Sequence, residues 1–445
     1  MMSIYLFTLV FLCGVPCNAL PLKDSIQREL IQALTANDVK VSGMPEVPLP
    51  GTFEGDMVMT PIQKKAIRDD IIARKTGNLG RKRKLLADTN FYWPQAIVPF
   101  EIDASLMSSR VIWRRIQTAI QMWESKTCLR FVPRSISLSG QLGHKDYVLI
   151  QSDSRHSCIS NVGRIRGVQS VNISAICSAG RIAHELGHTI GFVHEQSRPD
   201  RDLYVHINYN NVATNRTGEF EKYSNSKVTT YRLPYDIGSI MHYKSTAFSI
   251  DQRLLQTITT DDPLVQKWMG QRDDLSFLDA KLANLAYRCN NGCPVSPPCM
   301  NGGYIGPTCT CVCPIGLTGP YCDTPIIAQG CGGKLTASSG VIQSSNFPAN
   351  YNPDTECSWL IEAPADSRVD LKIEEFHIEE DFEDACNNDY LEIKLYGLQQ
   401  VGQKYCGESA RGRNITYNKG GHLLIRFVSD FSTEEKGFRL EYRIV

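Results

Sequence analysis

The spacing of apolar side chains predicts several helices along the chain. Apolar residues recur at helical intervals over residues 25–35 and 61–75, and a Pro/Gly-rich extended piece separates these two segments. Further helices are expected over residues 108–125, 178–193 and 275–288. The helix over residues 108–125 has the strongest pattern, with one broad apolar face formed by Val111, Ile112, Ile116, Ala119, Ile120 and Trp123.

Strand patterns occur in two regions. In the first half of the chain, residues 91–102 read as a strand with proline punctuation, and residues 147–151 form a short apolar run. Residues 158–177, which lie between two cysteines, are glycine-rich and are expected to form a loop. Short alternating segments with Asn, Gly and Pro turns predict an all-β sandwich in the C-terminal part, at residues 369–373, 390–395, 423–428 and 438–444.

Length and composition favour several globular domains. A chain of 445 residues is too long for one ordinary domain, so two to four are expected. Its hydrophobic content of 42% is sufficient for packed cores. The formal net charge is zero and the one dense basic run is at residues 81–84, so nucleic acid is not an expected partner.

Residues 1–19 have the pattern of a secretory signal peptide. An apolar core is followed by small residues that end at Ala19, although the usual positive charge before the core is absent. A membrane anchor is the alternative explanation. No later run is apolar for eighteen residues, so we expect a secreted, extracellular product without a membrane span once residues 1–19 are removed.

Cysteine usage agrees with secretion. Of sixteen cysteines, Cys13 and Cys17 lie in the leader, which leaves an even number for disulfide bonds. The four cysteines between residues 85 and 289 can pair in three ways, and spacing does not decide among them. Six more crowd into residues 290–324, a segment too small for an adequate core without disulfides. Sequons for N-glycosylation, each a weak signal alone, occur at Asn172, Asn215 and Asn414.

Residues 20–84, called the leading segment below, contain no cysteine and end in the basic run. These two features are typical of a propeptide that is removed by an activating protease. A solvated charged loop is the alternative explanation of the basic run. From about Leu85 the composition changes to that of a globular domain.

The most specific chemical pattern is the stretch HELGHTIGFVHEQSRPDRDLYV, which begins at His184. His184 and His188 are four residues apart and therefore share one face of a helix. Gly191 lets the helix end and the chain turn, so that His194 can return as a third imidazole ligand. Three ligands leave one position open for water, as a catalytic zinc needs, and Glu185 is placed to accept a proton from that water. A structural zinc site is the alternative, but it asks for a fourth protein ligand and leaves Glu185 unexplained.

This stretch follows H-E-x-x-H-x-x-G-x-x-H and continues as E-x-x-R-x-D-R-D, and it resembles the astacin metalloproteases, which are metzincins. SIMHY at residues 239–243 resembles the Met-turn of that family. The resemblance covers residues 85–289 and implies an α+β metzincin (astacin-like) catalytic domain. The implied zinc ligands are His184, His188 and His194.

The same resemblance implies roles for four further residues. Glu185 would be the general base. Tyr243 would be a further zinc ligand that swings away and hydrogen-bonds the tetrahedral intermediate. Met241 would lie under the metal, and Glu195 would meet the amino terminus that activation frees.

The leading segment carries a second motif. FEGD at residues 53–56 is similar to the family's F-x-G-D latency motif, in which Asp56 would occupy the open zinc position. A carboxylate there replaces the nucleophilic water and blocks the chemistry. The resemblance therefore implies a latent zymogen, cut near residues 83–85 by an activating protease.

Two resemblances cover the rest of the chain. Residues 290–324 resemble a small disulfide-rich EGF-like module, although Cys309, Cys311 and Cys313 are unusually close together. Residues 331–445 resemble a CUB domain, an all-β sandwich. Taken together, the three resemblances imply the disulfides Cys128–Cys289, Cys158–Cys177, Cys293–Cys309, Cys299–Cys311, Cys313–Cys322, Cys331–Cys357 and Cys386–Cys406.

Some CUB domains bind calcium through acidic residues. The residues that could do so here are Glu379, Asp389 and Asp430, and solvated surface carboxylates are the alternative explanation. Ca²⁺ is therefore a second expected cofactor beside Zn²⁺.

The sequence thus predicts a secreted zinc metalloendopeptidase that hydrolyses extracellular proteins. Similarity to nematode astacins with this domain order suggests matrix, cuticle or egg-envelope proteins as substrates. The rival class is a non-catalytic extracellular binding protein, which the loss of a ligand or of Glu185 would favour. The sequence shows no such loss.

Overall fold

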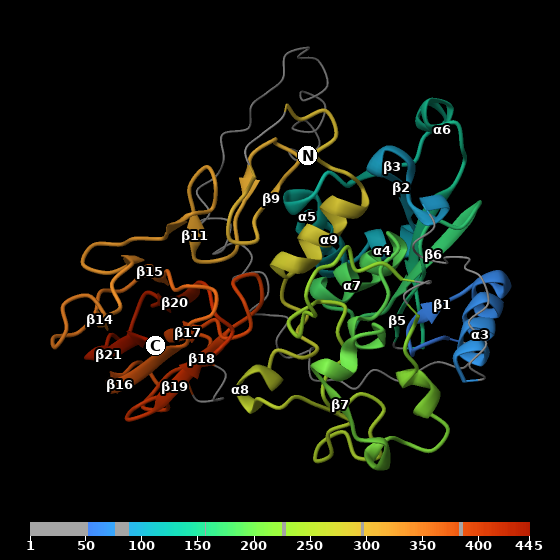
Figure 1. Ribbon diagram of the computed structural model, residues 1–445. Coiled ribbons are helices and arrows are strands. Elements are labelled where there is room, and N and C mark those ends of the chain that lie inside the picture. The colour runs from blue at the N-terminus through green and yellow to red at the C-terminus, as the bar shows by residue number, and fades with distance from the viewer. Residues whose placement is uncertain (1–51, 76–88, 156, 225–227, 295–297, 382–385) are drawn as a thin grey trace. The chain divides into compact units, whose positions relative to one another are not determined.

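A computed structural model describes residues 52–75, 89–155, 157–224, 228–294, 298–381 and 386–445 (Figure 1). All of these residues belong to one compact unit that spans residues 44–445. The expected signal peptide at residues 1–19, the expected helix over residues 25–35 and the basic run at residues 81–84 lie outside the described residues.

The N-terminal domain contains a six-stranded sheet (Figure 1). Strand β5 runs antiparallel to β6, whereas the other neighbouring strands, including β1 beside β5, are parallel. The order across the sheet is β1 (Met57–Val58), β5 (Cys158–Asn161), β6 (Val168–Ile173), β4 (Tyr147–Ser152), β2 (Ile97–Ile102) and β3 (Arg130–Pro133).

The structure differs from two of the sequence predictions for this sheet, one of a loop and one of a strand. The segment expected to be a loop between Cys158 and Cys177 contains β5 and β6, because Val171 and Ile173 point into the core while β6 pairs along its whole length with β4. The strand predicted from residue 91 begins only at Ile97, because short 3₁₀ turns at Thr89–Phe91 and Pro94–Ala96 precede it.

Helix α5 (Arg110–Lys126) packs against α7 (Ala179–Thr189) and contributes Ile116 and Trp123 to the main core. The predicted apolar face of α5 is wrong at Val111, which is 58% exposed. The helix predicted to reach residue 193 ends at Thr189. The other helices of this domain are α3 (Pro61–Lys75), α4 (Ala104–Met107), α6 (Ile136–Leu142), α8 (Pro263–Gln266) and α9 (Phe277–Ala286).

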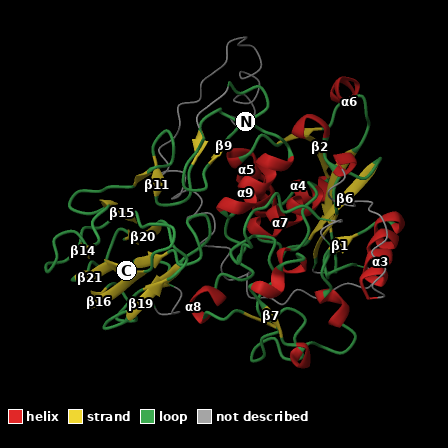
Figure 2. Cartoon of the chain, in the orientation of Figure 1, coloured by secondary structure: helices red, strands yellow, loops and turns green. Residues whose placement is uncertain are grey.

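The region between α7 and α9 is built mainly from loops and short turns, as Figure 2 shows. One small sheet pairs β7 (His206–Ile207) with β8 (Ile258–Thr259). Buried aromatic side chains, including Phe220, Tyr235 and Tyr243, give this region a core of its own. Disulfides Cys128–Cys289 and Cys158–Cys177 tie the domain together.

A small module follows at residues 293–325, with two two-stranded sheets: β9 (Tyr304–Ile305) with β10 (Cys311–Val312), and β11 (Leu317–Thr318) with β12 (Thr324–Pro325). Its disulfides are Cys293–Cys309, Cys299–Cys311 and Cys313–Cys322. Across the described residues of the whole chain, no helix is both long enough and apolar enough to cross a membrane.

The C-terminal domain consists of two sheets around a core that includes Trp359, Phe376, Phe427 and Phe438. Disulfides Cys331–Cys357 and Cys386–Cys406 lie in this domain. The first sheet has the order β13 (Gly333–Leu335), β15 (Glu356–Ile361), β20 (Leu423–Val428), β17 (Tyr390–Ile393) and β18 (Gln403–Tyr405). The second has the order β14 (Ser339–Gln343), β21 (Gly437–Ile444), β16 (Val369–His377) and β19 (Asn414–Tyr417).

Candidate metal centre

Helix α7 holds the first two histidines of the candidate site. Its N-terminus is capped by the Ser178 hydroxyl, and the four-residue spacing places His184 and His188 on one face. Between them, Gly187 lies against the Met-turn: a Cβ at this position would be 2.6 Å from Sδ of Met241. A side chain at residue 187 would therefore displace the thioether of Met241 from its contact with the helix.

A tight turn after α7 returns the third histidine to the site. Gly191 has φ of +106°, in the region that favours glycine, and the amide of Phe192 donates to the carbonyl of Gly187 at 3.0 Å. His194 follows in an extended conformation.

The three imidazoles converge with their Nε2 atoms, and all three side chains are buried. Nε2 of His184 lies 3.1 Å from Nε2 of His188. Their Nδ1 atoms face away and lie 2.7 Å from the carbonyl oxygen of Ile240 and 2.9 Å from that of Phe192. Nδ1–H groups that donate to these carbonyls leave the Nε2 lone pairs free to bind a metal.

The leading segment reaches into this site through a narrow turn. The backbones of Phe53 and Met57 exchange two hydrogen bonds, of 2.8 and 3.1 Å, and Asp56 lies within the loop that they close. Oδ2 of Asp56 lies 3.2 Å from Nε2 of both His184 and His194. The structure therefore brings Asp56 and the three predicted histidine ligands together in one group.

The charges of this group fit a divalent cation. Burial by itself would lower the pKa of His194, but Asp56 and Glu54 raise it to about 10. The two carboxylates therefore stabilise a positive charge beside them. Oδ1 of Asp56 is buried without a hydrogen-bond donor. Burial lowers the pKa values of His184 and His188, which favours the neutral imidazoles that bind metals. Three nitrogen donors and one carboxylate are a donor set that zinc accepts.

The predicted base and the predicted tyrosine lie beside this group. Glu185 is buried, and the hydroxyl of Ser160 on β5 donates to its Oε2 at 2.6 Å. The hydroxyl of Tyr243 donates to the backbone carbonyl of Glu54 at 2.5 Å, and its ring lies 4.5 Å from that of His194 between centroids. In this form of the chain, the hydroxyl of Tyr243 therefore donates its hydrogen bond to the leading segment.

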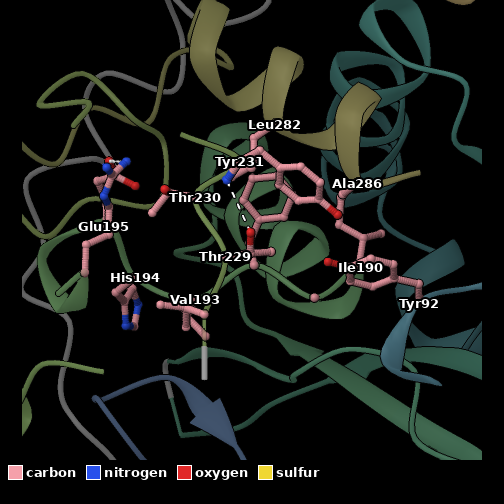
Figure 3. Close-up of a pocket in the computed structure, with 14 residues that line it drawn as sticks. Tyr92, Ile190, Val193, His194, Glu195, Thr229, Thr230, Tyr231, Leu282 and Ala286 are labelled. Atoms are coloured by element: carbon pink, nitrogen blue, oxygen red, sulfur yellow. Dashed lines mark hydrogen bonds and ion pairs between the residues drawn. The ribbon is translucent and has the colours of Figure 1, made fainter. Parts of the chain in front are cut away.

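His194 is one of the residues that line an apolar pocket (Figure 3). Glu195 lines it and pairs with Arg198 at 2.9 Å. Burial raises the pKa of Glu195 to about 7, even though Arg198 opposes the shift. The other labelled lining residues are Tyr92, Ile190, Val193, Thr229, Thr230, Tyr231, Leu282 and Ala286.

In the C-terminal domain, the three predicted calcium ligands also lie together. Asp389 is buried, and it accepts hydrogen bonds from the amide of Asp430 at 2.6 Å and from the hydroxyl of Tyr351 at 2.5 Å. Burial, together with the charges of Asp430 and Glu379, raises the pKa of Asp389 to about 6. Oε2 of Glu379 is buried without a hydrogen-bond partner. A cation bound among these three carboxylates would relieve their mutual repulsion.

The three sequons lie in different settings. Asn215 and Asn414 are exposed, Asn215 in a turn and Asn414 on the edge strand β19. Asn172 lies in the interior of the sheet on β6, and its Oδ1 accepts a hydrogen bond of 2.6 Å from Gln151.

Sequence reasoning gave no role to several residues that the structure places at the site. Ser160 was missed because β5 was not recognised as a strand, so nothing connected it with Glu185. Glu54 stands at the unspecified position of F-x-G-D, and the presence of a second carboxylate so close to Asp56 was the only signal. Nε2 of His242 lies 2.7 Å from the hydroxyl of Tyr235, and burial lowers the pKa of His242 to about 4.

Three converging imidazoles, two of them on a helix with the H-E-x-x-H spacing and the third after the turn that ends it, define a metzincin-type metal centre. Comparison with known proteins agrees with this class. Residues 86–288 match the peptidase family described as "Astacin", and residues 331–442 match the family described as "CUB domain".

The similar proteins include two curated relatives. "Blastula protease 10" of Paracentrotus lividus is 39% identical over 399 residues, which cover 88% of this chain and 65% of that protein. "Zinc metalloproteinase nas-36" of Brugia malayi is 33% identical over 426 residues, which cover 88% of this chain and 70% of that protein. This chain belongs to the astacin family of zinc metalloproteases. It spans 65% of the length of the first of these relatives.

Among solved structures, the hatching enzyme "High choriolytic enzyme 1" of Oryzias latipes is 32% identical. The match covers 47% of this chain and 99% of that chain, with a TM-score of 0.41.

Proposed function

We propose that this chain is the latent form of a secreted zinc metalloendopeptidase that hydrolyses extracellular proteins. The observation that carries the proposal is the convergence of three buried imidazoles and Asp56, with the carboxylate of Glu185 on the same helix. Seven disulfide bonds among the described residues support an oxidising, extracellular destination.

In this proposal His184, His188 and His194 hold the zinc of the active enzyme. When bound, zinc supplies a water of lowered pKa and a Lewis acid for the scissile carbonyl. Glu185, oriented by the hydroxyl of Ser160, accepts the proton of that water and returns it to the leaving amine. Once the leading segment has left, the hydroxyl of Tyr243 is free to donate a hydrogen bond to the developing oxyanion.

The leading segment also covers the edge where a substrate would bind. Strand β1 lies beside β5, which would become the outermost strand if β1 were removed. An extended peptide can then add to the backbone of β5, next to Glu185. The substrate class implied by the family resemblance is extracellular protein, such as matrix, cuticle or egg-envelope components.

Activation would remove the leading segment and create a new amino terminus near residues 83–85. The pocket beside Glu195 supports the role suggested for that residue, since a buried carboxylate with a pKa of about 7 gains from the arrival of a positive charge. The activating protease would act at the basic run of residues 81–84.

The test of the proposed activity compares the intact chain with the same chain cut after the basic run. We expect the cut protein to cleave an extracellular-protein peptide library and the intact protein to be nearly silent. A zinc chelator should abolish cleavage, and added Zn²⁺ should restore it. Cleavage that resists complete removal of the metal would contradict the proposal.

We also propose that Glu379, Asp389 and Asp430 bind Ca²⁺. The cation would relieve the repulsion among the three carboxylates, and extracellular calcium modules have Kd values of about 10⁻⁴–10⁻³ M. In about 10 mM Ca²⁺, the C-terminal domain should therefore gain roughly 1.4–2.7 kcal/mol in its free energy of unfolding. Thermal unfolding of the full chain with Ca²⁺ and with Mg²⁺ measures this gain. Asp389→Asn should abolish it, and an equal gain in the variant would rule out the site.

A further inference from the structure

The third histidine of the metal centre differs from the other two in what supports it. Nδ1 of His184 and of His188 lies against backbone carbonyls of the catalytic domain itself. Nδ1 of His194 instead lies 2.8 Å from Oε2 of Glu54, which belongs to the leading segment. Within the described part of the chain, Glu54 is the one acceptor for this atom. The leading segment therefore contacts His194 at both ring nitrogens, through Glu54 at Nδ1 and through Asp56 at Nε2.

Glu54 is held in this position by its surroundings. Its side chain is 1% exposed, and its backbone carbonyl accepts the hydroxyl of Tyr243. Its φ of +50° is unusual for a residue with a side chain, and the turn closed by Phe53 and Met57 maintains it. The next residue, Gly55, packs so closely on Phe248 that a Cβ would lie 2.9 Å from the ring. The turn thereby fixes the backbone from which the side chain of Glu54 reaches His194.

A carboxylate that accepts the Nδ1–H of a metal-binding histidine fixes the tautomer and the orientation of the ring and increases its basicity. Removal of such a partner typically lowers metal affinity by about 10–100-fold. The contact of Glu54 with His194 has this arrangement, but its carboxylate belongs to the segment that activation would discard.

We propose that Glu54 is a positioning residue that strengthens zinc binding by His194 in the latent form, so that cutting off the leading segment weakens the hold on the metal. This inference rests on the proposed function in one respect, because it takes residues 20–84 to be removed on activation. The leading segment would then have two separate effects at one imidazole: Asp56 blocks the open coordination position, and Glu54 retains the ion.

The experiment measures zinc release from the intact, full-length chain. Zinc-loaded protein is mixed with an excess of a chromophoric chelator, and the release rate is followed by absorbance. We expect Glu54→Gln, which removes the charge but keeps an acceptor, to release zinc faster than the wild type. Glu54→Ala, which removes both, should be faster still, by about 10–100-fold over the wild type. Asp69→Asn is the matched control, because it makes the same acid-to-amide change on the exposed face of α3.

Cutting provides a second, internal control. Residues 54 and 69 leave with the leading segment, so all four proteins yield the same mature chain and must then release zinc at one common rate, which should exceed that of the intact wild type. Equal release from intact wild type and Glu54→Ala would overturn the inference, and so would an equally large increase in Asp69→Asn. If Glu54→Ala is poorly folded, its near-ultraviolet circular dichroism will show this, and the comparison of intact Glu54→Gln with the intact wild type still tests the inference.

Failure of the inference and failure of the proposed function are distinguishable. A mature chain that binds zinc but cleaves no peptide would contradict the proposed function, whereas the order of release rates among the intact variants would still stand. Conversely, normal cleavage by the mature chain together with identical release rates would reject only the role of Glu54.

Discussion

Replacing Glu185 by glutamine is expected to lower kcat of the cut enzyme by at least about a hundredfold, since general acid–base catalysis contributes roughly 10²–10⁴-fold. Glutamine has the same shape and can still accept the hydrogen bond from Ser160 through its amide oxygen, so the fold should be preserved. It cannot accept a proton from water or return one to the leaving amine. The loss should therefore appear in kcat, with KM nearly unchanged.

The measurement pairs peptide kinetics with metal content. Because Glu185 is not one of the converging ligands, Glu185→Gln should retain zinc in the same ratio as the wild type. Glu101→Gln makes the same change at an exposed residue paired with Arg134, and it should leave both zinc content and kcat unaltered. If Glu185→Gln retained the wild-type kcat, the assigned general base would be wrong. A loss of zinc in this variant would show instead that the residue supports the metal.

The metal ligands were predictable because their geometry is local. The four-residue spacing of His184 and His188 and the position of Gly191 depend only on helix geometry and on a left-handed turn, and both features are encoded within eleven residues. The bounds of α3 followed from a local pattern in the same way. Such features need no knowledge of the rest of the fold.

What the sequence could not provide depends on contacts between distant segments. Glycines in the segment between β5 and β6 favoured the prediction of a loop. The two strands are defined by their pairing with each other and by that of β6 with β4. Val111 satisfies the helical period, yet it falls at the margin of the buried face, where the neighbouring elements decide exposure. Glu54 reaches His194 across 140 residues of sequence, and no periodic pattern predicts such a contact.

The leading segment contacts His194 from two sides, and the two contacts have separate expected effects on latency and on metal binding. Asp56 faces the side of the imidazoles on which a metal would bind, whereas Glu54 faces the opposite side of one ring. Tyr243 is occupied by the same turn through the carbonyl of Glu54. Three contacts that would change on activation therefore depend on a loop of three residues, closed by the backbone pair of Phe53 and Met57.

Replacing Asp56 by alanine is expected to give the intact chain measurable peptidase activity. Burial would raise the pKa of Asp56, but the charge of His194 lowers it well below its usual range, so the carboxylate stays ionised beside the three imidazoles. Removing one partner of a buried ion pair destabilises the paired arrangement by about 3–5 kcal/mol. Here the paired arrangement is the one in which Asp56 blocks the site. This corresponds to a roughly hundredfold to several-thousandfold larger population of the unblocked site.

Initial rates on a small peptide measure this gain, with mass spectrometry confirming that the chain remains intact during the assay. Asp69→Asn should stay as silent as the wild type, because its side chain is exposed on α3. After cutting, Asp56→Ala and the wild type become the same mature protein and should have equal kcat/KM. An intact Asp56→Ala variant that is as silent as the wild type would show that steric coverage by β1, rather than the carboxylate, maintains latency.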